Sequence, residues 1–520
     1  MRDVVIVGAG PVGLFLACEL GLAGCSVLVL EREPEPGSPW RADPLGMRGL
    51  SAASAGAFHR RGMLRPLLAT SGLPDRSDRP GDGTDEAAPP RSAGHFAGMV
   101  LDPARVDLDA LPYRVPGPAA EGVMTNLAAI EAVLHERATA LGVEVRRGVT
   151  VAGIARDEEG VTVRAEADGP GRERTYAARW LVGCDGGRSA VRRAAGFEFT
   201  GTEPQFTGYV VLADVADPEK LRPGFTLTPA GMYVRMPAKG HLGVLEGDGG
   251  AFDRSRPLTR EHLQAVLRRV SGTDVTLNDV RHASSFTDRA MQATTYRRGH
   301  VLLAGDAAHI HSPLGAQGLN LGIGDAMNLG WKLAATVRGH APDGLLDTYA
   351  RERHPVGARV LDWTRAQSAV MRPGPYAQAL QGVLRDLLGT RDGTTYTYGT
   401  VSGASLRHDL GDDLGDAHPL VGREAPDLRL ADGTRLGELA RDGRGLALDL
   451  TPDRSLRGAA RRWERRIRYV AGPATDTLGA DAVLVRPDGV VAWAGGRAPD
   501  GEAFARAATR WFGLRPGTTR

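Results

Sequence analysis

Two glycine-rich segments carry most of the chemistry that this sequence predicts. In the first, Gly8, Gly10 and Gly13 form the pattern GxGxxG directly after an apolar run. Such a turn is tight and brings the first amide groups of the following helix against a pyrophosphate. Glu31 ends the next apolar run, about twenty residues on, where a carboxylate accepts hydrogen bonds from a ribose diol. The residues predicted to bind this dinucleotide are Gly8, Gly10, Pro11, Val12, Gly13, Glu31 and Arg32.

The second segment, AGDAAHIHSPLGAQGLNLGIGDAMNLGWKLA, covers residues 304–334. It reads as the end of a buried strand, a loop, and a helix that contains several glycines. Each glycine inside a helix costs roughly 0.5–1 kcal/mol relative to alanine. The sequence therefore predicts that something approaches the backbone closely, either a ligand or a neighbouring helix.

A third segment, WLVGCDGGRSAVRRAAG, places Asp185 and Gly186 after a short strand. Together, the three segments resemble the class A flavoprotein monooxygenases of the para-hydroxybenzoate hydroxylase fold. The resemblance implies that the dinucleotide is FAD, that Asp185 and Gly186 lie near FAD and the nicotinamide path, and that Asp306 bonds the ribityl or ribose region. It also implies that the helix glycines leave room for the flavin, whose pyrimidine carbonyls face the first helix amides. The residues assigned to the isoalloxazine are Pro313, Gly315, Ala316, Gln317, Gly318, Leu319 and Asn320.

The sequence departs from this family pattern at several positions. Ala316 stands where the family often has glycine, and this small replacement is expected to leave flavin binding intact. The family's arginine after the second strand matches either Arg41 or Arg48, at the pyrophosphate or at the flavin edge. Arg48 joins Pro313 and Gly315 in the predicted catalytic group. The remaining residues assigned to the cofactor are Val151 and, where relatives have a Pro-Gln pair, Thr125 or Asn126.

The elements that must position these residues predict an α/β protein with three domains. A discontinuous, Rossmann-like FAD-binding domain is expected at residues 1–72, 123–200 and 282–370. Residues 73–122 and 201–281 predict an inserted β-sheet domain that covers the flavin, with the substrate between sheet and flavin. Residues 371–399 form a helical linker. Residues 400–520 resemble the thioredoxin-like domain of aromatic polyketide hydroxylases, although the absence of cysteine there excludes dithiol chemistry.

The composition of the chain limits the kinds of binding partner and the cellular location that we expect. The chain has 520 residues and a net charge of +2, which argues against a nucleic-acid or membrane-surface partner. Three cysteines without metal-ligand spacing suit a reducing cytoplasm, and we expect neither a metal site nor a signal peptide. The polar segment 74–94, rich in proline and glycine, predicts a mobile loop.

The family resemblance implies an FAD- and NAD(P)H-dependent monooxygenase. NADPH, or NADH, is expected to bind transiently and reduce FAD, and a flavin C4a-hydroperoxide formed with O₂ then hydroxylates a polycyclic aromatic polyketide. Baeyer–Villiger oxidation, epoxidation and antibiotic inactivation on the same fold are alternatives, as is a flavoprotein that no longer oxygenates. The enzyme is predicted to be a monomer or a homodimer. The candidate substrate-binding residues are His95, Tyr209, Tyr233 and Arg235.

Overall fold

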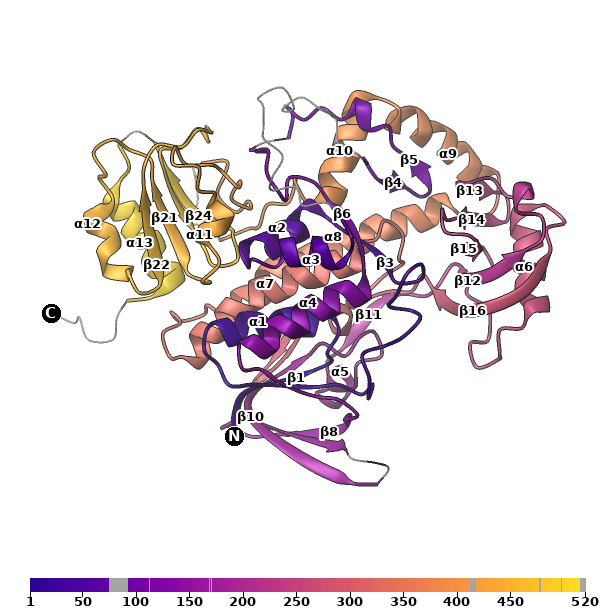
Figure 1. Cartoon of the computed structure of the whole chain (residues 1–520), viewed down its shortest axis with the longest axis horizontal. Coiled ribbons are helices and arrows are strands. Elements are labelled where there is room, and N and C mark those ends of the chain that lie inside the picture. The colour runs from indigo at the N-terminus through magenta and orange to yellow at the C-terminus, as the bar shows by residue number, and fades with distance from the viewer. Residues whose placement is uncertain are drawn as a thin grey trace.

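A computed structural model describes residues 1–73, 92–111, 113–167, 169, 171–411, 418–476, 478–496 and 498–514 of the chain. Helices α7 (Gly318–Val337) and α8 (Thr348–Val370) cross the middle of the molecule (Figure 1). The C-terminal sheet lies at one end, and a second sheet, covered by α6 (Arg260–Ser271), lies at the other. This arrangement confirms the predicted α/β fold class. Of the predicted loop 74–94, only the last three residues fall within the described ranges.

An eight-stranded sheet forms the centre of the first domain. Six strands run in the order β18-β19-β10-β1-β2-β7, and β9 and β8 continue from β10. The inner strands pair in parallel and consist of apolar runs buried on both faces, as parallel sheets require. The strands are β1 (Arg2–Val7), β2 (Val27–Leu30), β7 (Glu144–Arg146), β8 (Thr150–Arg156), β9 (Val161–Glu166), β10 (Glu173–Gly183), β18 (Arg297–Arg298) and β19 (Val301–Leu303).

Helix α7 packs closely against α1 (Pro11–Leu22), and two of its glycines make this contact possible. A Cβ atom on Gly322 would lie 2.5 Å from Val12 Cγ2, and one on Gly330 would lie 2.4 Å from Glu19 Cβ. The expectation that the helix glycines leave room for a flavin is therefore wrong for these two positions, because α1 occupies the space. Helix packing accounts for this part of the lost helix propensity.

A five-stranded antiparallel sheet, in the order β13-β14-β15-β12-β16, forms the second domain. The apolar face of α6 packs on one side of it through Leu263, Val266, Leu267 and Val270. The other side packs against Leu314 and Met371 of the first domain and its extension. The strands are β12 (Thr207–Val215), β13 (Gly224–Thr228), β14 (Gly231–Arg235), β15 (His241–Glu246) and β16 (Leu277–Thr287), so the sheet continues past the predicted boundary at 281.

Smaller elements connect the two domains. Strand β3 pairs with β6, β4 pairs with β5, and β17 lies between β11 and β20. The bounds of these strands are β3 (Met47–Leu50), β4 (His95–Phe96), β5 (Met99–Val100), β6 (Val123–Asn126), β11 (Phe199–Thr202), β17 (Ala290–Ala293) and β20 (His309–Ile310). The remaining helices are α2 (Ala52–Arg60), α3 (Leu64–Thr70), α4 (Leu127–Ala140), α5 (Ala190–Ala194), α9 (Pro375–Leu388) and α10 (Arg391–Ser402), with the short turn η3 (Gly305–Ala307).

The C-terminal domain has the sheet order β22-β21-β23-β24. Its first two strands pair in parallel around α12, and an antiparallel pair followed by α13 completes it, as in a thioredoxin-like fold. Its elements are α11 (Leu436–Leu439), β21 (Gly445–Asp449), α12 (Arg457–Ala460), β22 (Ile467–Ala471), β23 (Ala482–Val485), β24 (Val491–Gly495) and α13 (Gly501–Phe512).

A buried cluster of charges joins this domain to the helices of the first. Arg486 Nη2 lies 2.7 Å from Glu352 Oε2 on α8 and 2.5 Å from Asp488 Oδ2, and Lys332 Nζ on α7 lies 3.0 Å from Glu352 Oε1. All of these side chains are inaccessible or nearly so. Burial opposes ionisation of Glu352, but Arg486 and Lys332 outweigh it and hold the pKa of this carboxyl well below its usual range. The two domains are therefore joined by buried charged side chains that neutralise one another.

We expect Arg486→Met to destabilise the protein strongly. Removing one member of a buried ion pair leaves an uncompensated charge and costs about 3–5 kcal/mol, whereas an exposed pair contributes about 0–1 kcal/mol. The midpoint of thermal unfolding should drop by roughly 3–5 °C. The matched control is Arg506→Met, since Arg506 is exposed and pairs only loosely with Asp500 and Glu502. Equal midpoints for the two variants would contradict the structural role of the cluster.

Candidate functional site

Two glycines of the GxGxxG turn are needed for close packing, and the third faces open space. Gly8 has φ +105°, and a Cβ atom there would lie 2.4 Å from the carbonyl oxygen of Cys184. A Cβ on Gly13 would lie 2.0 Å from the carbonyl oxygen of Gly8, whereas a Cβ on Gly10 would meet nothing within 4 Å. Helix α1 starts at Pro11 without a side-chain cap, so its first amide groups face the open side of Gly10. This is the geometry that a pyrophosphate needs.

Glu31 is held in place by backbone amides. Its Oε2 accepts a hydrogen bond of 2.6 Å from Ala9 N, and its Oε1 accepts one of 2.9 Å from Glu33 N. Each carboxylate oxygen keeps a second lone pair for a ribose hydroxyl. Arg32, which was also assigned to the cofactor, is exposed and pairs with Glu33. Val151 lies on β8 and is partly buried against the core.

Asp185 organises its own loop. Its carboxylate accepts hydrogen bonds from Ser189 Oγ at 2.5 Å and from the amides of Ala190 and Val191 at the start of α5. Gly186 follows with φ +77° and open space on its Cβ side. The loop between β10 and α5 is thus fixed from within, with its glycine side free.

Asp306 and the start of α7 face the same space. A Cβ on Gly318 would lie 3.9 Å from Asp306 Oδ1, and the exposed Asp306 side chain has no hydrogen-bond partner in the described ranges. Gln317 precedes α7 without capping it, so the amides of the first turn are also free of intrahelical partners. A carboxylate and a row of amides that lack protein partners suit a polar cofactor with hydroxyl donors and carbonyl acceptors.

Asp325 fixes this arrangement from inside the protein. Its Oδ2 accepts a hydrogen bond of 3.0 Å from Gly305 N and lies 2.7 Å from His309 Nε2, while its Oδ1 lies 2.8 Å from Arg353 Nε. Burial opposes ionisation, but His309 and Arg353 outweigh it and lower the pKa of the fully buried Asp325 carboxyl. Sequence reasoning assigned no role to Asp325 or Arg353. The signal was a carboxylate within an otherwise apolar, buried helix.

The loop before α7 leaves room for a flat ligand. Gly315 has φ +80°, and a Cβ there would meet only Gln367 Nε2 at 3.7 Å and Gln317 Cγ at 3.9 Å. Ala316 also has a positive φ, of +53°. Asn320 ties the helix to β3, since its Nδ2 donates to Gly49 O and its Oδ1 accepts from Ser51 N. Pro313 is exposed beside this open face.

The structure separates the two arginine candidates. Arg41 pairs with Glu131 of α4 at 3.0 Å, although burial raises the pKa of that carboxyl to about 7. Arg48 donates only to backbone carbonyl oxygens, and burial lowers its pKa. Asn126 lies opposite Met47, next to Arg48 on the paired strands, and caps α4 through Ala129 N. Of the two, Arg48 has the side chain left for an anionic ligand or an electron-rich ring.

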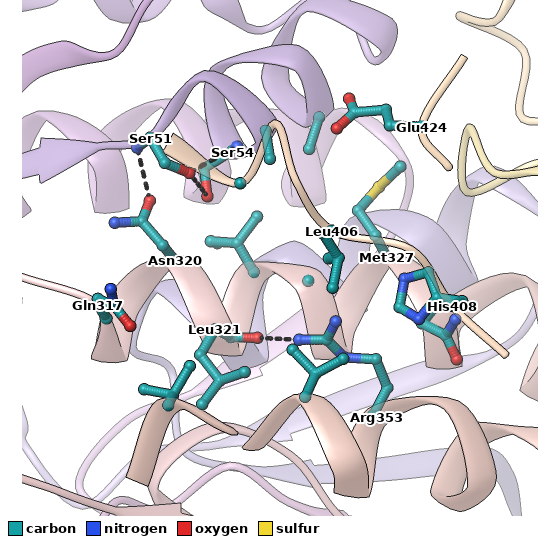
Figure 2. Close-up of a pocket in the computed structure, with 18 of the residues that line it drawn as sticks. Ser51, Ser54, Gln317, Asn320, Leu321, Met327, Arg353, Leu406, His408 and Glu424 are labelled. Carbon is teal, nitrogen blue, oxygen red and sulfur yellow. Dashed lines mark hydrogen bonds between the residues drawn. The ribbon is translucent and has the colours of Figure 1, made fainter. Parts of the chain in front are cut away.

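A cavity of about 340 Å³ lies on the other face of α7 (Figure 2). Gln317 and Asn320 stand at one end, and His408 and Glu424 stand at the other. Helices α2, α7, α8 and α10 wall the cavity, and Asp488 and Val490 of the C-terminal domain reach it. A nitrogen of each of two lining rings, His408 Nδ1 and Trp363 Nε1, is buried without a hydrogen-bond partner among the described residues.

Three of the predicted substrate-binding residues do not face the first domain. Tyr209 and Tyr233 are buried between the five-stranded sheet and α6, where Tyr209 Oη lies 3.2 Å from His262 Nε2. Arg235 alternates onto the same side and donates to Pro218 O. The assignment of these three to the substrate is therefore wrong, because their strand positions point to the outer face. His95 packs on Phe225, and burial lowers its pKa to about 4.

Two family models match the chain. One described as "FAD binding domain" matches residues 1–364, and one described as "Aromatic-ring hydroxylase, C-terminal" matches residues 418–515. The chain belongs to the FAD-dependent aromatic-ring hydroxylases. The predicted family resemblance is thereby confirmed.

Relatives of this aromatic-ring hydroxylase match it over nearly its whole length. It is 43% identical over 513 residues to a monooxygenase of Claviceps purpurea (strain 20.1), with 98% of both chains covered. It is 40% identical over 525 residues to the rifampicin monooxygenase of Streptomyces venezuelae, with 99% of both covered. Its fold matches OxyS anhydrotetracycline hydroxylase from Streptomyces rimosus with a TM-score of 0.83 and 35% identity, covering 98% of this chain and 99% of that chain. The protein is an FAD-dependent aromatic monooxygenase.

The described residues fit FAD in three respects. The open side of Gly10 meets uncapped amides of α1, the Asp306 carboxylate lacks a protein partner, and Gly315 leaves a face that no protein atom fills. Within the same ranges, no group of three or more His, Cys, Asp or Glu side chains is arranged to hold a metal ion. No helix there is both long and apolar enough to cross a membrane.

We expect Asp306→Ala to weaken FAD binding, because a buried cofactor hydroxyl loses its acceptor at about 1–3 kcal/mol. This corresponds to a Kd that is roughly 5- to 150-fold higher, measured by titrating the apoprotein with FAD and following flavin fluorescence. Asp386→Ala removes a carboxylate from an exposed position on α9 and serves as the control. An unchanged Kd for Asp306→Ala would contradict the placement of FAD at this carboxylate.

Proposed function

We propose that the protein uses FAD and NADPH to hydroxylate a polycyclic aromatic compound that binds in the cavity of Figure 2. The observation that carries the proposal is the position of this cavity, which begins at Gln317 and Asn320, the residues that open α7. The resemblance places the isoalloxazine at these residues. A substrate in the cavity would therefore meet the flavin edge without moving any element of the fold.

Part of the other candidate location is filled. At one end, the inner face of the five-stranded sheet, where the substrate was expected, packs against the buried side chains of Phe96, Leu314 and Met371. The cavity along α7, by contrast, is hollow, and its volume falls in the range of roughly 300–1,000 Å³ that is typical of ligand pockets. Its walls combine aliphatic residues with Trp363 and Tyr396, which suits flat, apolar rings.

The cavity also offers polar partners for a substituted aromatic system. Burial lowers the pKa of His408 to about 4, so the ring is neutral near pH 7, and its unpartnered Nδ1 can form a hydrogen bond with a phenolic hydroxyl. Trp363 Nε1 can donate to a carbonyl oxygen. When FAD is bound and reduced, it supplies the activation of O₂ from which one oxygen atom is transferred. The first amides of α7, which no side chain caps, would stabilise negative charge on a ring bound beside them.

The comparisons support two kinds of substrate, a biosynthetic intermediate or an antibiotic. The match to OxyS anhydrotetracycline hydroxylase supports hydroxylation of a polyketide during biosynthesis, and the match to the rifampicin monooxygenase supports inactivation of an antibiotic. Hydroxylation and Baeyer–Villiger oxidation both add one oxygen atom, so the product mass is the same for the two reactions. NMR separates them, because only Baeyer–Villiger oxidation forms a lactone or opens a ring. Use of NADPH over NADH, a cytoplasmic location, and a monomeric or homodimeric state stay predictions.

Filling the cavity should weaken substrate binding. Val360 lines its α8 wall, and Val360→Phe places a ring in the space proposed for the substrate. The Kd should rise at least roughly tenfold for compounds that bind the parent, from a panel of polycyclic aromatics that includes anhydrotetracycline. Val100→Phe makes the same change at a position that is 70% exposed and serves as the control. Equal affinity in parent and Val360→Phe would exclude this cavity as the substrate site.

Gly315→Val tests the flavin side of the same loop. A branched side chain at φ +80° faces the open space proposed for the ring, so we expect a folded protein that binds FAD weakly or oxidises NADPH with release of hydrogen peroxide. Gly339→Val imposes the same backbone strain at φ +69° at the far end of α7. Product formed per NADPH, FAD retention and peroxide release distinguish the variants. Full coupling in Gly315→Val would show that the isoalloxazine does not lie against this loop.

A further inference from the structure

An open groove of about 690 Å³ lies between the loop after β10 and the β16 edge of the five-stranded sheet. Its lining is strongly basic, with five arginines and a single carboxylate, that of Asp279. The arginines that line it come from three segments and are Arg188, Arg254, Arg256, Arg260 and Arg281.

Three of these arginines lack an acidic partner. Arg256 lies 3.6 Å from Asp253, and Arg260 lies 2.8 Å from Glu261. Arg188, Arg254 and Arg281 have no carboxylate within 4.0 Å in the ranges that the structure describes. Burial, and then the positive charge of Arg188, lower the pKa of Arg254. Like charges gathered without counter-charges cost free energy unless an anion joins them.

The groove leads towards the flavin site. Arg188 follows the Asp185–Gly186 pair by two residues, on the loop that the resemblance places near FAD and the nicotinamide path. On the opposite wall, the ring of His282 lies 6.2 Å from that of Trp40. His282 and His241 both pair with Leu212, and Arg48 is near enough to His241 to add to the lowering of its pKa that burial causes.

We propose that this groove holds the 2′-phosphate end of NADPH and gives the enzyme its preference for NADPH over NADH. The inference rests on the proposed function, which requires a nicotinamide donor. The guanidinium group binds a phosphate through two parallel hydrogen bonds, and Ser284 and Ser285 in the lining add hydroxyl donors. NADH has no group for these arginines to bind.

A charged, open groove also suits a hydride donor that must dissociate from the enzyme after each reduction. The chain has a single GxGxxG fingerprint, at Gly8–Gly13, and FAD takes it. A second dinucleotide therefore needs another means of attachment. Ion pairs on an open surface form fast and are screened by salt, so they hold NADPH briefly and release NADP⁺ after the hydride has moved.

The test uses the FAD-loaded protein and two independent readouts. The first is the affinity for 2′,5′-ADP, which carries the 2′-phosphate but no nicotinamide, compared with 5′-AMP, which lacks that phosphate. The second is the ratio of kcat/KM for NADPH to that for NADH. The variants are Arg254→Gln and Arg281→Gln. The control is Arg222→Gln, an exposed arginine of the same domain outside the groove.

We expect the parent to bind 2′,5′-ADP at least tenfold more tightly than 5′-AMP. Each groove variant should raise the Kd for 2′,5′-ADP and the KM for NADPH at least tenfold, while the values for 5′-AMP, NADH and the Arg222→Gln control stay within twofold of the parent. Equal affinity of the parent for both nucleotides, or equal losses with NADPH and NADH, would overturn the proposal. If no aromatic compound is hydroxylated, the proposed function fails, yet the binding of 2′,5′-ADP still decides the role of the groove.

Discussion

The buried charge of Asp325 holds together the segments around the start of α7. One carboxylate takes hydrogen bonds from a backbone amide, an imidazole and a guanidinium, which belong to η3, β20 and α8. A buried anion with fewer partners would be costly, so these segments keep their positions relative to α7. The Asp306 carboxylate and the free amides of α7, which bind nothing within the described protein, are presented to the same space because Asp325 holds the turn that carries Asp306.

Helix α7 packs against α1 and α8, and three of its glycines make these contacts possible. Gly322 and Gly330 allow the close approach of α1, and Gly324 lies against the guanidinium of Arg353. A side chain at Gly322 or Gly330 would push α1 away, and one at Gly324 would displace the Arg353 guanidinium. Close packing along the helix therefore offsets the lost helix propensity at these positions.

The sequence predicted the elements that depend on local pattern. The GxGxxG turn, the Asp306 segment and the parallel sheet could be read because apolar runs and glycine spacing determine them. The sequence could not predict which side of the sheet carries Tyr209, Tyr233 and Arg235. Alternation along a strand reveals two faces but does not show which of them a helix covers. Here α6, whose apolar side is contributed by a distant segment, takes the face with the tyrosines. The partners of Asp325 were missed for a similar reason, since Arg353 lies 28 residues away and meets it only through the packing of α7 and α8.

The C-terminal domain acts through contact. It has no cysteine for redox chemistry, yet Arg486 and Asp488 place it against Glu352 and Lys332, on the helices that lead to the cofactor. Asp488 is also part of the cavity wall, so one residue belongs both to the domain junction and to the hollow beside the flavin-facing helix end. A displacement of the C-terminal domain would therefore open the end of the cavity that is farther from Gln317. The ion cluster that joins the C-terminal domain to α7 and α8 thus also positions a residue of the cavity wall.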